Sequence, residues 1–132
     1  MLRKSLMPFY DGGPMIRLIT CLRRKESISH QEFRKYWDDA TFAGLMDKAA
    51  TVLKPVKHAR CLSLQVGANI KIMESRGSDE PYDGIIEWWW ESATQLAPLL
   101  NTSQAQSLIL EIQAYQKQFA DFDRSPSFFT EA

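Results

Sequence analysis

The most distinctive hydrophobic pattern of the chain lies at residues 82–92, where three consecutive tryptophans follow two isoleucines and one carboxylate, Glu87. Side chains of a β-strand point alternately to the two faces of a sheet, so residues 85, 87 and 89 should share one face and residues 86, 88 and 90 the other. Exposed indoles would form an apolar patch of a size that soluble monomers avoid. We therefore expect both faces of this strand to be covered.

The first third of the chain predicts a strand and a helix. Residues 15–22 are apolar and β-branched, which is typical of a strand buried on both faces. Ser29 and Glu32 then have the spacing of a capping box, and apolar residues recur every three or four positions after them. This pattern predicts one helix that begins at Ser29 and ends at Pro55, because proline disfavours helical backbone before it.

The remaining patterns predict four further elements and one long connection. Residues 58–66 alternate loosely between apolar and polar positions and predict a second strand. Residues 67–81 are rich in glycine, asparagine, serine, aspartate and proline, so they predict a connection that holds one turn of structure. After the tryptophan strand, apolar spacing predicts helices at residues 92–100 and 103–119, and residues 127–129 predict a last strand.

The order strand, helix, strand, strand, helix, strand is that of an α+β, ferredoxin-like sandwich with a four-stranded antiparallel sheet. We predict one such domain at residues 15–132, preceded by a tail at residues 1–14. Helices cover only one face of the sheet in this fold. Because the tryptophan strand is bulky on both sides, we predict that a second copy of the same sheet covers the other face in a homodimer.

Composition and charge exclude several classes of partner. The 132 residues include 16 basic and 16 acidic side chains, so the formal net charge of zero gives no reason to expect nucleic acid or an anionic membrane. No apolar run approaches the about 20 residues of a spanning helix, and a soluble, cytoplasmic protein is expected. Cys21 and Cys61 lack metal-ligand spacing, and we expect them to be buried, reduced thiols that form neither a zinc site nor a disulfide.

Four segments, at residues 18–25, 28–37, 82–89 and 123–131, together resemble the EthD family, named for ethyl tert-butyl ether degradation. They include the capping box with its Tyr-Trp pair, the strand that begins Tyr-Asp-Gly, and the Ser-Phe-Phe-Thr-Glu tail. The resemblance implies a dimeric α+β barrel in which two ferredoxin-like subunits pair their sheets. It also implies relatives that act without metal or organic cofactor, as polyketide cyclases, dehydratases, decarboxylases or small monooxygenases.

Two positions depart from the family pattern. Where the family commonly continues the Tyr-Trp helix into Val-His-Gly-Pro, this chain places Thr41 at the position of the histidine. Gln65 stands where family members often carry another histidine near the end of the second strand. Neither side chain titrates near neutral pH, so both can hold a ligand by hydrogen bonds but cannot shuttle a proton.

Glu87 is the candidate catalytic residue, because a carboxylate among aromatic neighbours can act as a general acid or base. The alternative is structural, with Glu87 accepting hydrogen bonds in an internal pair. Tyr36 and Trp37 lie on the inner stripe of the first helix, where they could contact a ligand or simply belong to the core. Trp89 is a further candidate ligand contact, and His30 at the start of the helix is expected to be solvated.

Three functional classes remain open from the sequence. The first is a cofactor-free enzyme, an oxidoreductase, dehydratase or cyclase of catabolic or secondary metabolism, that acts on an aromatic or polyketide-like substrate in an apolar pocket. The second is a non-catalytic homodimer that binds a small hydrophobic ligand. The third is a purely structural dimer with a filled interior, which would lack a cavity of about 300 Å³, the lower limit of ligand pockets.

Overall fold

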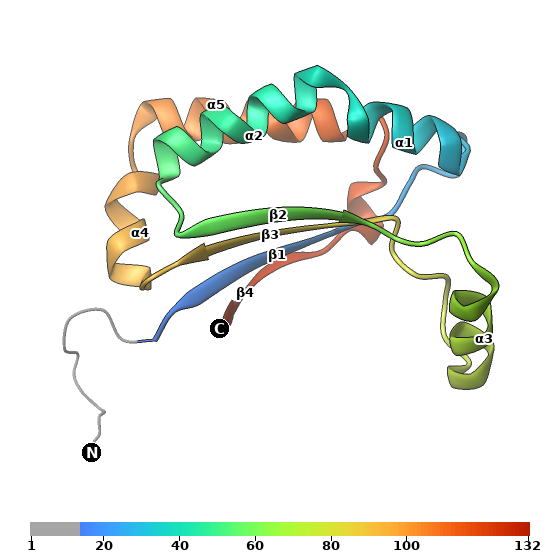
Figure 1. The fold of residues 1–132 in the computed structure, drawn as a ribbon. Helices are drawn as coiled ribbons and strands as arrows, with labels where there is room; N and C mark the ends of the chain where they lie inside the picture. The colour runs from blue at the N-terminus through green and yellow to red at the C-terminus, as the bar shows by residue number, and fades with distance from the viewer. Residues whose placement is uncertain (1–13) are drawn as a thin grey trace, which may run out of the picture.

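The computed structural model describes residues 14–132, so most of the tail predicted at residues 1–14 lies outside the described part (Figure 1). Four strands and five α-helices alternate along the chain, with a short 3₁₀ helix, η1, before the last strand. Their order is β1 (Ile16–Leu22), α1 (His30–Asp38), α2 (Ala40–Leu53), β2 (Lys57–Leu62), α3 (Gly67–Arg76), β3 (Gly84–Trp90), α4 (Ala93–Leu100), α5 (Ser103–Gln116), η1 (Phe122–Arg124) and β4 (Ser127–Glu131).

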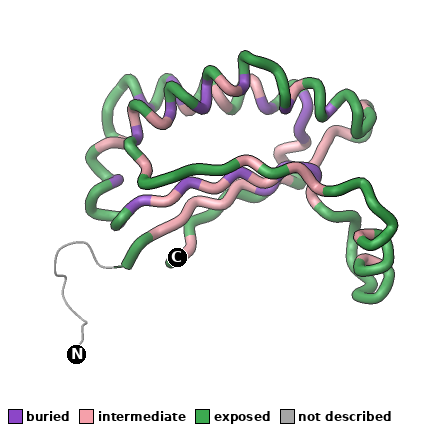
Figure 2. The backbone as a smooth tube through the Cα atoms, in the orientation of Figure 1, coloured by how far each residue is buried: buried purple, intermediate pink, exposed green. Residues whose placement is uncertain are grey.

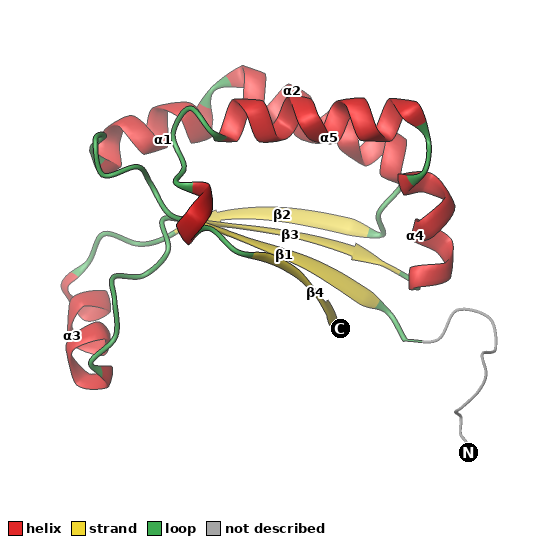
Figure 3. Cartoon of the chain, turned by 180° about the vertical axis from the view of Figure 1, so that it is seen from behind, coloured by secondary structure: helices red, strands yellow, loops and turns green. Residues whose placement is uncertain are grey.

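The strands form one antiparallel sheet in the order β2-β3-β1-β4, the strand order of a ferredoxin-like fold, as the sequence predicts. Helices α1, α2 and α5 lie over one face of this sheet, and α4 closes one end of the layer between them (Figures 1 and 3). Within residues 14–132 no helix layer covers the other face, which we call the open face. Helix α3 projects from the opposite end of the sheet, away from the layer of α1, α2 and α5.

The predicted alternation along β3 is confirmed. Ile86, Trp88 and Trp90 are buried beneath the helices, whereas residues 85, 87 and 89 on the open face are only partly buried (Figure 2). The register carries this alternation across the sheet, so the open face also presents alternate residues of the other strands. These are Arg17, Ile19, Cys21, Lys57, Ala59, Cys61, Phe128 and Thr130.

The predicted single helix from Ser29 to Pro55 is in fact two helices. The capping box of Ser29 and Glu32 is present and begins α1. Asp39 then adopts extended backbone (φ −64°, ψ 140°), ends α1, and caps α2 by accepting a hydrogen bond from the Thr41 N–H at 2.8 Å. Hydrogen bonds from the backbone and side chain of Thr41 lower the pKa of the Asp39 carboxyl. The apolar positions keep their helical spacing across the break between α1 and α2. Periodicity alone therefore did not reveal that the two helices are separate.

Three further expectations are corrected. The connection predicted at residues 67–81 contains the ten-residue helix α3, and the second strand ends at Leu62 instead of continuing to residue 66. None of the α3 residues is buried, so this helix lacks the apolar stripe by which a packed helix is recognised. Cys21 is buried as expected, but Cys61 is exposed, because it lies on the open face of the edge strand β2.

An aromatic core fills the space between α1, α2, α5 and the sheet. Phe33, Phe42 and Phe119 are almost fully buried, and Phe33 packs edge-on against Phe119 with ring centroids 5.1 Å apart. Tyr115 of α5 donates its hydroxyl to the carbonyl of Tyr36 at 2.7 Å, which ties α5 to the end of α1. Among residues 14–132, none of the helices combines the length and the apolar composition required to cross a bilayer.

Candidate functional site

A cavity of about 280 Å³ lies between the helices and the helix-facing side of the sheet, close to the lower limit of ligand pockets. Strands β1, β3 and β4 form its floor, and α2, α4 and α5 form its walls. Most of its lining is apolar, with Met46, Ala49 and Ile112 in the walls. The volume is just below the about 300 Å³ that distinguishes a ligand pocket from a filled interior, so the structural dimer stays an alternative.

Two indoles make the floor of the cavity rigid and flat. Trp88 and Trp90 lie nearly parallel, with an interplanar angle of 15° and ring centroids 6.4 Å apart. Trp90 donates its Nε1–H to the carbonyl of Leu53 at 2.8 Å, which fixes the ring in place beneath the end of α2. A flat aromatic surface of this kind favours planar, largely apolar ligands.

The polar groups of the cavity are few, and they lie toward η1 and β4. Thr20 and Ser127 hydrogen-bond to each other at 2.8 Å, and Ser125 donates to the carbonyl of Asp121 at 2.6 Å. Gln116 of α5 lines the cavity and is only 6% exposed. A side-chain amide can both donate and accept hydrogen bonds, so Gln116 is well placed to bind a polar atom of a ligand.

Among residues 14–132, those that line the cavity include no Asp, Glu, His, Lys, Arg, Cys or Tyr. The side chains around a ligand there can therefore bind and orient it, but they cannot supply or accept a proton near neutral pH. Metal ligands are similarly scarce: within residues 14–132, histidine, cysteine, aspartate and glutamate nowhere form a group of three that could hold a metal ion.

None of the six residues singled out from the sequence lines this cavity. Trp37 is buried in the aromatic core, where it stacks with Phe33 at 5.8 Å, and its carbonyl accepts a hydrogen bond from Arg60 at 2.7 Å. Tyr36 lies beside it and stacks on Phe119 at 5.2 Å. Both therefore contact core side chains, which is the alternative that helical spacing left open.

Thr41 and Gln65, the residues in place of the family histidines, lie in different parts of the molecule. Thr41 is exposed in the first turn of α2, where its N–H is bound by Asp39. Gln65 is exposed on the segment before α3, at the edge of a second hollow of about 350 Å³. The structure does not bring the two side chains to a common site.

Glu87 and Trp89 lie on the open face, so the sheet separates them from the cavity. Glu87 pairs with Arg17 across the strands, with 4.0 Å between the guanidinium Nη1 and the carboxylate Oε2. The Trp89 ring lies between two cations, with Lys57 Nζ 4.5 Å and Arg17 Cζ 5.8 Å from its centroid. These contacts place Glu87 in an ion pair and leave Trp89 without a role in the cavity.

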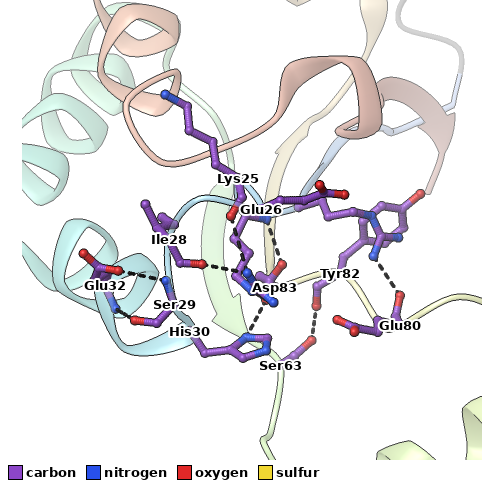
Figure 4. Close-up of polar contacts among 12 residues, drawn as sticks. Lys25, Glu26, Ile28, Ser29, His30, Glu32, Ser63, Glu80, Tyr82 and Asp83 are labelled. Carbon is purple, nitrogen blue, oxygen red and sulfur yellow. Dashed lines mark hydrogen bonds and ion pairs between the residues drawn. The ribbon is translucent and has the colours of Figure 1, made fainter.

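Sequence reasoning missed a polar group around Asp83, which Figure 4 shows. Asp83 precedes β3 and is 7% exposed, and its carboxylate accepts a hydrogen bond from the Arg24 N–H at 2.8 Å. His30 Nδ1 lies 3.0 Å from the same carboxylate, so His30 is not simply solvated. The one sequence signal was an aspartate directly before a glycine and an apolar strand.

The EthD domain model matches residues 25–123 of the chain. A solved ethyl tert-butyl ether degradation family protein from Bacillus halodurans is similar, with 14% identity over 89% of this chain and 98% of its own, and a TM-score of 0.58. A dimeric ferredoxin-like protein of unknown function from Bacteroides fragilis is also similar. It has 7% identity over 92% of this chain and 100% of its own, and a TM-score of 0.58. The cofactor-independent oxygenase SnoaB from Streptomyces nogalater has 10% identity over 91% of this chain and 94% of its own, and a TM-score of 0.51. No functionally curated protein matches the chain.

Proposed function

Since the chain belongs to the EthD family, we propose that it binds a small, flat, largely apolar molecule in the cavity between its helices and its sheet. The observation that carries this proposal is that the nearly parallel indoles of Trp88 and Trp90 and the side chain of the buried residue Gln116 line one cavity. The rings suit an aromatic body, and the amide suits one hydroxyl or carbonyl group on it.

A cofactor-free enzymatic reaction on the same class of ligand is the second candidate. The family membership and the fold shared with an oxygenase that needs no cofactor favour it. The cavity lining argues for a limited role of the protein in such a reaction, because none of the lining side chains in the described part of the chain could transfer a proton. Any turnover would then depend on the ligand's own reactivity once it is oriented.

We further propose that the protein is a homodimer, paired through the open faces of two sheets. Phe128 is 47% exposed on this face, beside the partly buried Ile19 and Trp89. Arg17 and Glu87 pair within the face, so a second sheet could cover both without burying an isolated charge. The dimeric state of the ferredoxin-like neighbour from Bacteroides fragilis supports a homodimer.

Ligand binding is tested with 1-naphthol and with naphthalene, which lacks the hydroxyl group, by following tryptophan fluorescence. We expect Gln116→Leu to weaken 1-naphthol binding about fivefold, the effect of one hydrogen bond of about 1 kcal/mol, and to leave naphthalene binding unchanged. Ala49→Phe should abolish binding of both compounds because it fills the cavity. Equal binding of naphthol by the Ala49→Phe variant would contradict the proposal. Mass spectrometry of aerated mixtures then separates turnover from binding alone.

A further inference from the structure

A second site lies outside the cavity, where the β1–α1 connection meets the start of β3 (Figure 4). Its centre is the carboxylate of Asp83, whose side chain is 8% exposed. The Arg24 N–H donates to Oδ2 at 2.8 Å, and the Arg24 guanidinium Nε lies 4.0 Å from Oδ1. A backbone donor and a nearby cation hold this carboxylate in one orientation.

The same carboxylate orients the imidazole of His30. Nδ1 of His30 lies 3.0 Å from Asp83 Oδ1, and a charged carboxylate only accepts hydrogen bonds, so Nδ1 carries the proton of the neutral ring. The lone pair of the neutral imidazole is then on Nε2. The His30 side chain is 42% exposed, so the rest of the ring is accessible from outside.

His30 lines a hollow of about 350 Å³ beneath α3. Its walls are mostly apolar, and two of the wall residues, Leu64 and Ile70, are 69% and 55% exposed in this chain. Asn69 donates to the carbonyl of Leu64 at 2.8 Å, which fixes the segment that carries these side chains. Glu80 lines the hollow as well and makes it unfavourable for a ligand that enters as an anion.

We propose that His30 is a general base, positioned by Asp83, for a small apolar molecule that enters this hollow as a neutral phenol or enol. In the proton transfer the O–H bond of the ligand breaks, an N–H bond forms at Nε2 of His30, and the ligand keeps the electron pair as an oxyanion. Asp83, 3.0 Å from Nδ1 of His30, stabilises the resulting imidazolium. This site is independent of the cavity floored by Trp88 and Trp90.

The experiment uses para-nitrophenol, whose anion absorbs visible light, in a His58→Gln background that leaves His30 as the one histidine. At a pH where the free compound is mostly neutral, the protein should produce the visible band of the anion. His30→Gln and Asp83→Asn should each strongly reduce that band, because the first removes the base and the second removes the carboxylate that orients it. In ¹⁵N NMR spectra of the unliganded protein, Nδ1 of His30 should be protonated and Nε2 unprotonated, and Asp83→Asn should mix the two forms.

Matched controls separate this site from the cavity. Glu80→Gln removes a charge from the hollow and should preserve or strengthen the band, while Ala49→Phe should leave it unchanged. Loss of the band in Ala49→Phe, or its persistence in His30→Gln, would overturn the proposal. If Asp83→Asn does not fold, the tautomer of His30 is measured by NMR in the chain that keeps Asp83. A neutral ring with its proton on Nε2 would also overturn the proposal.

Discussion

The indole of Trp37 lies directly against the backbone of Gly84, where α1 packs on the first residue of β3. A Cβ atom placed on Gly84 would stand 2.5 Å from Cζ3 and 2.7 Å from Cη2 of that ring. Trp37 is itself 4% exposed and enclosed by Phe33 and Phe42, so the ring cannot move aside cheaply. The absence of a side chain at Gly84 therefore sets how closely the helix approaches the sheet.

Gly84→Ala should lower the free energy of unfolding by about 1–3 kcal/mol, the usual effect of overpacking a filled core. Gly44→Ala is the matched control, because its Cβ would have no neighbour within 4 Å and it lies inside α2. That substitution should raise the free energy of unfolding by about 0.5–1 kcal/mol, since glycine is a poor helix former. Urea unfolding followed by circular dichroism measures both, and equal effects of the two substitutions would contradict this account.

Trp90→Phe should remove the donor that satisfies the carbonyl of Leu53 at the end of α2. Trp88→Phe serves as the reference, because it removes a similar apolar area. The indole N–H of Trp88 has no hydrogen-bond partner within residues 14–132, so that substitution removes no hydrogen bond. We expect Trp90→Phe to be the more destabilising by about 1–3 kcal/mol, the effect of leaving a buried carbonyl unpaired. Identical urea midpoints for the two variants would show that this hydrogen bond contributes nothing.

Phe128→Glu should dissociate the proposed homodimer, because it places a charge on the open face beside Ile19. Leu110→Glu is the control, since Leu110 is a comparably large apolar residue that is 66% exposed on α5, away from the open face. Sedimentation equilibrium at micromolar concentration should give the mass of two chains for the native protein and the Leu110→Glu variant. It should give the mass of one chain for Phe128→Glu. A native protein that sediments as a monomer would refute the pairing of the sheets.

The order of the elements could be predicted because it depends on local patterns. Alternation along residues 84–90 places Trp88 and Trp90 on one face in any strand, whatever the strand packs against. The capping box of Ser29 and Glu32 likewise uses only backbone groups within one helical turn. Helix α3 was missed for the converse reason: nothing packs on it, so its sequence carries no apolar stripe.

The candidate sites depend on contacts between distant segments, and for that reason the sequence predicted them poorly. Glu87 is surrounded by aromatic residues in the sequence. Side chains alternate along β3, however, so Glu87 lies on the opposite face of the sheet from its neighbour Trp88 and from the cavity. Gln116 carries no motif, and its importance comes from a cavity formed by three strands and three helices. His30 and Asp83 are 53 positions apart and meet because β1 and β3 pair in one register.

The sequence by itself determined which residues form strands, which faces those strands present and where the first helix begins, because hydrogen bonds and side-chain periodicity act over a few residues. Only the tertiary structure decided that Trp88 and Trp90 floor a cavity, that Gln116 lies in it, and that Asp83 orients His30. Those relationships arise when helices pack on a sheet at fixed register and distance, and no local pattern encodes which side chains then face the same space.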